Sequence, residues 1–227
     1  MKKDLIPPQE PIANIAYRKI LRQWALKSKA NRRYLIDKCA NEFYFWLESF
    51  VWLFEPRPEK GKSPIRPFIP WPHQRPMIDI ILENLGYRDM GLEKARGEGA
   101  TWSCLMIILH KWNFKSPGIE LQKPQFGIVS RNELSADNPE DPNSLGWKID
   151  WELKMLPKWM VGEGGSNPNK PGLRYTRNIS KHTWVNLETE STITAYAATG
   201  DLAAGGRKTL FFMDEFGRFE RGPDEKA

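Results

Sequence analysis

Apolar residues in the N-terminal quarter of the chain recur at the spacing of an amphipathic helix. Residues 11–30 carry them at intervals that predict a first helix: Ile12, Ile15, Ala16, Ile20, Leu21, Trp24 and Ala25. The same periodicity predicts a second helix from about Arg33 to Phe54. The next segment holds six prolines between Glu55 and Pro72, so a regular helix cannot continue there. We therefore expect a helical N-terminal segment (1–55), a proline-rich linker (56–72) and a core (73–227).

The remaining sequence alternates short apolar runs with helical stretches. The predicted strands are bounded by turn residues and lie at 90–95, 126–130, 183–187, 191–196 and 210–213, the third and fourth forming a hairpin. The predicted helices share a 3.6-residue period and lie at 74–84, 100–112 and 147–156. Residues 162–172 are rich in Gly, Asn and Pro, and we expect a flexible loop there. Helices that alternate with apolar strands are typical of an α/β fold with a largely parallel sheet.

The composition argues against a membrane or disulfide-rich protein. Of the 227 residues, 40% are hydrophobic and 27% charged, and no apolar run approaches the roughly 18 residues of a membrane span. The N-terminal sequence has no apolar signal segment. Cys39 and Cys104 lack a CxxC spacing, so we expect free thiols. We therefore expect a cytoplasmic protein with no membrane partner.

The excess of basic residues is compatible with a polyanionic partner, but it does not by itself indicate one. The formal net charge is +6, and many of the basic residues crowd into one N-terminal stretch: Arg18, Lys19, Arg22, Lys27, Lys29, Arg32, Arg33 and Lys38. Two interpretations stay open for this stretch. It forms either a solvated helix face or a surface that contacts the phosphate backbone of a nucleic acid.

Two adjacent acids follow the last apolar run of the chain. Residues 210–213 end directly before Asp214 and Glu215, the pattern of a buried strand that carries carboxylates to the edge of a parallel sheet. In phosphoryl-transfer sites the first acid supports Mg²⁺ and the second orients and deprotonates the attacking water. The alternative is a helix N-terminus, where acidic side chains are favoured by the helix dipole.

A glycine-rich turn lies upstream of this acid pair and before an apolar helix. Gly97 and Gly99 would let backbone N–H groups approach phosphate oxygens, and Thr101 offers a hydroxyl for Mg²⁺. Ala100 stands where the lysine of the GxxxxGK[ST] pattern is expected, so Lys94 and Arg96 are the available cations. The candidate nucleotide-binding residues of this turn are therefore Lys94, Arg96, Gly97, Glu98, Gly99, Ala100, Thr101 and Trp102. A plain strand–turn–helix connection is the alternative.

Two further polar residues flank this pair of motifs. Gln74 begins a helix shortly before the turn, and its amide could bond an adenine edge or could simply start the helix. Arg207 follows a pair of glycines, and it suits a γ-phosphate sensor or an arginine finger as well as a solvated loop. The three histidines have no metal-site spacing, and His110 on its apolar helix is expected to be packed.

The order of these motifs resembles the ATPase domain of the terminase large subunit of tailed bacteriophages, the DNA-packaging motor. The resemblance covers roughly Pro70 to Glu220. It includes the Trp71-Pro72-His73-Gln74 element, the glycine-rich turn and Phe212-Met213-Asp214-Glu215-Phe216. Several terminases similarly carry the phosphate-loop lysine at the front of the loop, which would give that role to Lys94.

The resemblance implies a P-loop NTPase-like fold, with three α/β/α layers and a mainly parallel central sheet. It implies ATP and Mg²⁺ as cofactors, with Thr101 and Asp214 at the metal. The catalytic residues would be Glu215, Asp214, Arg96 and Arg207. It further implies that the motor drives double-stranded DNA through a portal protein into a procapsid. A terminase small subunit, a homo-oligomeric, pentameric ring and a location in the host cytoplasm belong to the same expectation.

The chain also departs from the family pattern. Few residues follow Glu215, so we expect neither the coupling motif nor the C-terminal nuclease domain, and no nuclease activity. Two alternatives to a packaging motor remain open. One is another P-loop DNA translocase or helicase-like ATPase, and the other is a non-catalytic fragment that binds DNA or a protein partner.

Overall fold

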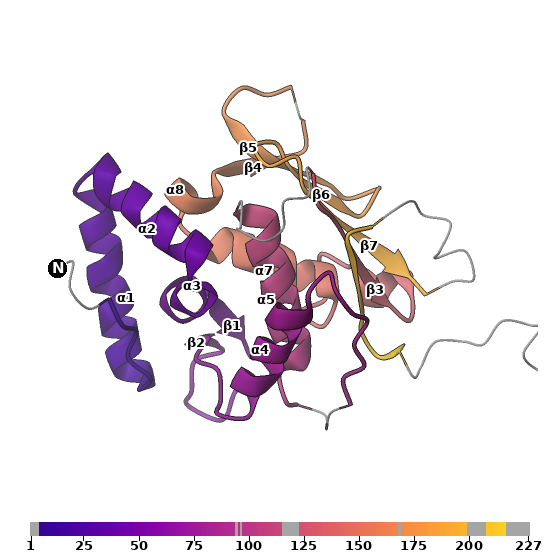
Figure 1. The fold of residues 1–227 in the computed structure, drawn as a ribbon, viewed down its shortest axis with the longest axis horizontal. Helices are drawn as coiled ribbons and strands as arrows, with labels where there is room; N and C mark the ends of the chain where they lie inside the picture. The colour runs from indigo at the N-terminus through magenta and orange to yellow at the C-terminus, as the bar shows by residue number, and fades with distance from the viewer. Residues whose placement is uncertain are drawn as a thin grey trace, which may run out of the picture.

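The computed structural model describes residues 5–93, 95, 97–114, 123–167, 169–198 and 208–216. These residues form a mixed α/β structure in which N-terminal helices lie on one side and a six-stranded mixed sheet lies on the other (Figure 1). The expected α/β class is therefore confirmed.

Three helices form the N-terminal part: α1 Pro11–Leu26, α2 Lys29–Asn41 and α3 Phe43–Phe50. Ser28 separates the first two, because its side chain accepts a hydrogen bond from the Asn31 N–H and caps α2. The single predicted helix over residues 33–54 was wrong. The backbone becomes extended at Glu42, and again at Val51, so two helices and a strand replace the one long helix.

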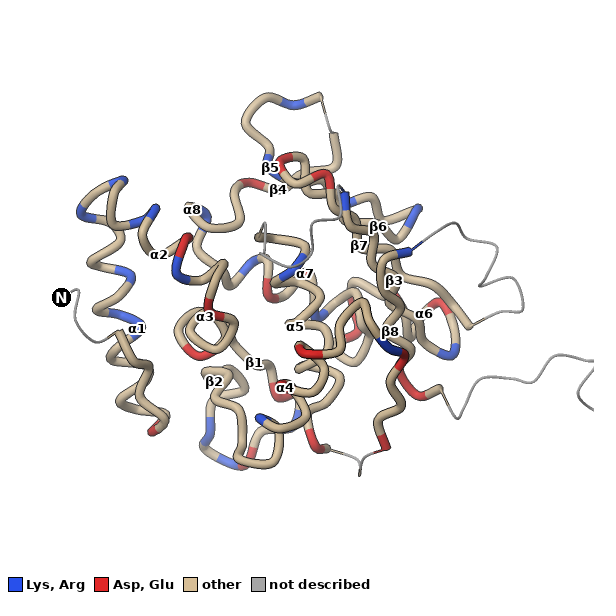
Figure 2. The backbone as a smooth tube through the Cα atoms, in the orientation of Figure 1, with Lys and Arg blue, Asp and Glu red and all other residues tan. Residues whose placement is uncertain are grey.

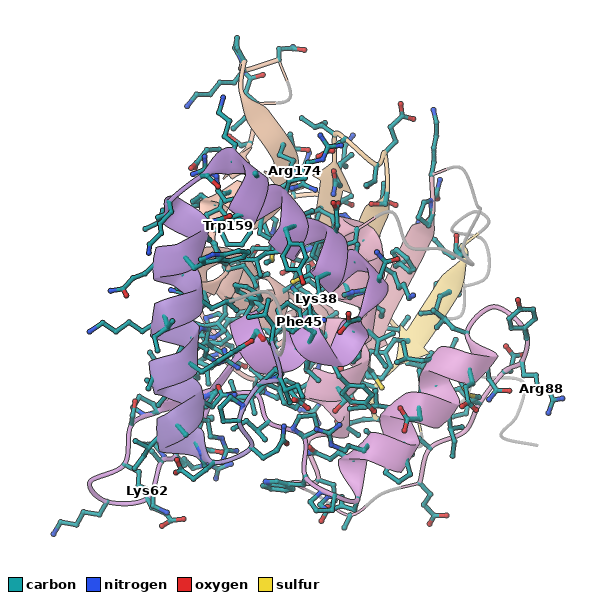
Figure 3. All side chains as sticks on the ribbon, turned by 60° about the vertical axis from the view of Figure 1, so that its left-hand side comes forward. Lys38, Phe45, Lys62, Arg88, Trp159 and Arg174 are labelled. Carbon is teal, nitrogen blue, oxygen red and sulfur yellow. The ribbon has the colours of Figure 1, made fainter. Side chains whose placement is uncertain are left out.

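A buried arginine explains how the chain can leave α3 so abruptly. Arg18 of α1 donates to the carbonyl oxygens of Glu48 (2.6 Å) and Val51 (2.8 Å), where the hydrogen bonds within α3 end. The chain then forms β1 (Trp52–Phe54), which pairs antiparallel with β2 (Ile65–Pro67) inside the proline-rich segment. Lys38 lies over the ring of Phe45, whereas Lys62 of the proline-rich segment and Arg88, which follows the helix at residues 74–84, extend outwards (Figure 3).

The longer predicted helices of the core are confirmed. They are α4 Gln74–Asn84, α5 Ala100–Asn113 and α7 Leu145–Met155. Two one-turn helices, α6 Glu133–Ala136 and α8 Lys158–Val161, were not predicted. Gly86 follows α4 with a positive φ of 83°, in agreement with the predicted end of that helix.

The sheet has the strand order β4-β5-β6-β7-β3-β8. Its strands are β3 Gln125–Ser130, β4 Glu163–Gly165, β5 Leu173–Asn178, β6 Thr183–Asn186, β7 Thr192–Ala197 and β8 Leu210–Met213. The pairs β4/β5, β7/β3 and β3/β8 are parallel, whereas β5/β6 and β6/β7 are antiparallel. The expected mainly parallel sheet must therefore be corrected to a mixed one. Short turns join β5, β6 and β7, and such turns can connect only antiparallel neighbours.

Two local predictions also need correction. Strand β4 lies in the expected loop 162–172, where Gly164 fits beneath the ring of Tyr175 because it has no Cβ. Residues 90–93 and 95, predicted as part of a strand, carry no strand in the structure. Met90 and Leu92 are exposed, and no strand of the described residues pairs with this segment, so its backbone has no ladder to join.

The core lies between the sheet and the helices. Trp184 and Ile193 of the sheet belong to the same buried cluster as residues of α5 and α7. In Figure 1, α1, α2 and α3 lie on the side of α5 and α7 that is away from the sheet. On the opposite face of the sheet, alternate residues of β6 and β7 stay partly exposed: Thr183, Val185, Thr192, Thr194 and Tyr196. A third layer over that face is thus not seen in the part of the chain that the structure describes.

Candidate functional site

The two motifs singled out in the sequence meet in space. The Thr101 hydroxyl donates to the carboxylate of Asp214, with Oγ1 lying 3.1 Å from Oδ1 and 3.3 Å from Oδ2. The two residues are 113 positions apart in the sequence. The contact therefore joins the start of α5 to the carboxyl end of β8, as a combined site requires.

The sheet fixes the position of the acid pair. Strand β8 runs parallel to β3, and the Asp214 N–H donates to the Val129 carbonyl oxygen at 2.9 Å, so the ladder extends to this residue. Glu215 follows with a positive φ of 56°, which is uncommon for a residue with a side chain. The chain thus turns sharply after the strand, and the Glu215 side chain is exposed at the edge of the sheet.

The glycine-rich turn adopts a backbone that other residues avoid. Gly97 and Gly99 have φ values of 90° and 71°, in the left-handed region that costs a side-chain-bearing residue energy. Gly99 is also the N-cap of α5, where no side chain caps the helix. Among the described residues, no side chain therefore competes with an anion for the first N–H groups of α5.

The Gln74 side chain fixes this turn through hydrogen bonds to the backbone. Its Nε2 donates to the Glu98 carbonyl oxygen at 2.9 Å, and its Oε1 accepts from the Trp71 N–H at 2.9 Å. A Cβ at Gly99 would lie only 2.5 Å from Gln74 Nε2, so the contact also explains why glycine occupies that position. In this structure Gln74 braces the turn, and its predicted bond to an adenine edge stays a prediction.

The other described residues of the turn have distinct surroundings. Glu98 forms an ion pair with His73, with Nε2 and Oε2 2.7 Å apart. Ala100 is buried and begins α5, while Trp102 is half-buried and lines the same cavity as Thr101. The predicted nucleotide-binding roles of Glu98, Ala100 and Trp102 therefore stay predictions.

A cavity of about 1070 Å³ opens over this arrangement. It is bounded by the turn, by the residues that follow β3 and β8, and by the proline-rich segment: Gly97, Gly99, Thr101, Ser130, Asp214 and Trp71 lie in its wall. The volume is slightly above the roughly 300–1,000 Å³ of small-molecule sites. Its position at the carboxyl ends of parallel strands is where α/β proteins bind ligands.

Lys148 is a cavity residue that the sequence did not single out. It lies in the first turns of α7, only 8% exposed, and donates to the carbonyl oxygen of Ser144 at 3.2 Å and to that of Asn143. Burial lowers the pKa of Lys148 to about 8, against the opposing influence of the Asp214 and Asp141 carboxylates. In the sequence it is one of many lysines on an amphipathic helix, and only its burial distinguishes it.

A buried ionic network fixes the chain segment that follows Asp137 and forms the edge of the cavity near Lys148. Arg177 of β5 contacts both carboxylate oxygens of Asp137 at 2.7 Å and bonds Asp150 of α7 at 3.2 Å. His182 Nδ1 lies 2.8 Å from Asp137, and the Trp184 indole donates to Asp150 at 2.7 Å. The segment after Asp137 is thus tied to the sheet before it forms the edge of the cavity.

Three of the expected site residues, Lys94, Arg96 and Arg207, lie outside the described residues. The described residues also contain no group of three or more His, Cys, Asp or Glu that could hold a metal by themselves. Mg²⁺ commonly takes one or two protein oxygen ligands and completes its shell with water and phosphate. Thr101 and Asp214 are a donor set of this kind.

In comparisons with known proteins, no family model and no curated protein sequence matches this chain. None of the described helices is both long and apolar enough to cross a lipid bilayer.

Proposed function

We propose that this chain is the ATP-hydrolysing part of a terminase large subunit, which drives double-stranded DNA through a portal into a procapsid. The observation that carries the proposal is the contact between Thr101 and Asp214 inside a large cavity. Two motifs chosen for complementary roles in phosphoryl transfer are 113 residues apart in sequence and adjacent in space. A plain strand–turn–helix connection gives no reason for that meeting.

The proposed roles follow from the chemistry of each group. The uncapped N-terminus of α5 and the glycine turn offer N–H groups to phosphate oxygens. Thr101 and Asp214 would hold Mg²⁺, which neutralises charge that develops on the transferring phosphoryl group. Glu215, exposed at the end of β8, would accept the proton of the attacking water. Lys94, Arg96 and Arg207 remain the proposed cations from outside the described residues.

Only part of the basic N-terminal stretch is exposed and could contact DNA. Arg18 is buried and Arg22 is half-buried, so they cannot serve an exposed basic face. The exposed residues of the basic stretch are Lys19, Lys27, Lys29 and Arg33, on and between α1 and α2 (Figure 2). Such a face suits sequence-independent phosphate contacts. The portal protein, the small subunit, a pentameric ring and the host cytoplasm are proposed with the motor.

The test is ATP binding and hydrolysis by the chain beside Glu215→Gln. We expect unchanged binding of Mg²⁺-ATP and a loss of turnover of about 100-fold or more, the usual contribution of a general base. Glu83→Gln, which changes an exposed carboxylate on α4, is the control and should behave as the parent. Equal hydrolysis in Glu215→Gln and the parent would exclude the role given to Glu215.

One observation favours a non-catalytic alternative. The described residues 90–93, which precede the glycine turn in the sequence, belong to no strand and so are not held by the sheet. A fragment that binds DNA or a partner would show no ATP turnover in any variant. Cross-linking to a portal protein separates a packaging motor from another P-loop translocase.

A further inference from the structure

Lys148 is a buried cation whose role the proposed site does not yet include. It lines the same cavity as Gly99, Thr101 and Asp214, and its side chain reaches the cavity wall from α7. Lysine is among the residues that are almost never fully buried without a partner. Its burial here therefore calls for a compensating group.

The groups around the ammonium only partly compensate it. Its two described hydrogen bonds go to carbonyl oxygens of Asn143 and Ser144, which are neutral. The negative charges that act on it are the carboxylates of Asp214 and Asp141, both in the cavity wall. Asp214 is the same carboxylate that would support Mg²⁺, so Lys148 and the metal would share one anion.

Other cations line the cavity, but they are placed differently. Arg57, Arg66 and Arg131 are exposed, and Arg75 is half-buried and paired with the Glu48 carboxylate. Of the described cations in the wall, Lys148 is the buried one, and a buried charge acts with less screening by water.

We propose that Lys148 is a phosphate-binding residue that balances the charge of Asp214 when no nucleotide is bound and binds the polyphosphate of a nucleoside triphosphate that enters with its metal ion. This inference rests on the proposed nucleotide site. A divalent cation alone adds positive charge beside Lys148, and the two repel. A triphosphate brings negative charge that attracts both, so the metal and the nucleotide bind best together.

The proposal predicts opposite effects of one substitution on two ligands. Lys148→Met should weaken Mg²⁺-ATP binding by about 10-fold, because one charge-assisted hydrogen bond is lost. The same variant should bind Mn²⁺ alone several-fold more tightly, because Asp214 loses a competing cation. Calorimetry gives the first affinity, and the paramagnetic resonance of free Mn²⁺ gives the second. Lys154→Met, an exposed lysine on the same helix, is the control and should change neither.

The outcomes separate this inference from the proposed function. Parent protein that binds no Mg²⁺-ATP overturns both. Parent protein that binds, beside a Lys148→Met variant that binds Mg²⁺-ATP equally well, overturns the role of Lys148 alone. Weaker binding of both ligands also overturns it, because that result describes a structural lysine. If thermal melting shows that Lys148→Met does not fold, Lys148→Gln, which can still donate to Asn143, replaces it.

Discussion

At the scale of single residues, His110 shows how a titratable group can serve packing alone. It is buried on α5, where its ring contacts those of Phe43, Trp46 and Phe114. Its Nε2 lies 2.8 Å from the Cys39 carbonyl oxygen, while Nδ1 is buried without a partner among the described residues. Burial lowers the pKa of His110 to about 4, because a protonated ring would place a charge in this apolar site.

This histidine should make the fold sensitive to acid. The unfolded chain takes up a proton near pH 6.5 and the native His110 near pH 4, so stability is complete above the first value and falls as the pH drops towards the second. Between pH 7.5 and pH 5 we expect a loss of about 2 kcal/mol from this residue. Urea unfolding at both values should show a smaller loss for His110→Gln. An equal pH dependence in the two proteins would contradict the assignment.

At the scale of elements, the start of α5 depends on glycine for two separable reasons. Gly97 and Gly99 both need a left-handed backbone, but only Gly99 also lies against a neighbour, Gln74. A Cβ at Gly97 would meet nothing within 4 Å. Substitutions at these two glycines therefore separate the cost of backbone strain from the cost of displacing Gln74.

The matched substitutions are Gly97→Ala and Gly99→Ala. Each should cost about 1–2 kcal/mol for the left-handed residue. Gly99→Ala should cost more, and should weaken ATP binding more, because Gln74 must move away from the Glu98 carbonyl. Thermal melting and calorimetric titration with Mg²⁺-ATP give the two comparisons. Equal effects of both substitutions would show that Gln74 does not position the turn.

The elements also show which parts of the fold can be predicted from sequence. Helix α4 was predicted with its observed bounds because its periodicity and following glycine are local signals. Strands β4 and β5 were missed, since Gly164 gains its meaning only from the Tyr175 ring on the neighbouring strand. The predicted helix over 33–54 was wrong because Arg18, far away in sequence, satisfies the carbonyl groups where α3 ends.

The candidate site, too, could be predicted from the sequence only in part. Thr101 and Asp214 could be chosen from the sequence because each lies in a short pattern with a chemical purpose. Lys148 could not, since its signal is burial beside a carboxylate, which arises only when α7 and β8 approach in the folded chain.

At the scale of the whole molecule, the helical N-terminal part and the sheet share one hydrophobic core. The buried cluster runs from Leu21 and Leu35 through Trp112 of α5 to Ile193 of β7. Polar contacts follow the same route, because Arg22 of α1 donates to the carbonyl oxygen of Met155 at 3.2 Å. The proline-rich segment therefore connects parts of one packed unit in the described structure.

This continuity predicts a single unfolding transition. Urea titrations followed by tryptophan fluorescence and by far-ultraviolet circular dichroism should coincide. Arg18→Met should lower the stability of the whole transition by about 3 kcal/mol, because two buried, charge-assisted hydrogen bonds to carbonyl oxygens are lost. Lys19→Met, one position later and exposed, is the control. Two separate transitions would show that the N-terminal helices fold as an independent domain.

The distance in sequence between Thr101 and Asp214 has a consequence for synthesis on the ribosome. The glycine turn is made 113 residues before the acid that completes the site. At about 5–20 residues per second, translation separates the two halves by roughly 6 to 23 seconds. During that interval the nascent chain carries the proposed phosphate-binding turn without the carboxylate proposed to bind the metal. The proposed site therefore cannot form until β8 has been made, and premature termination before β8 would remove Asp214 and Glu215.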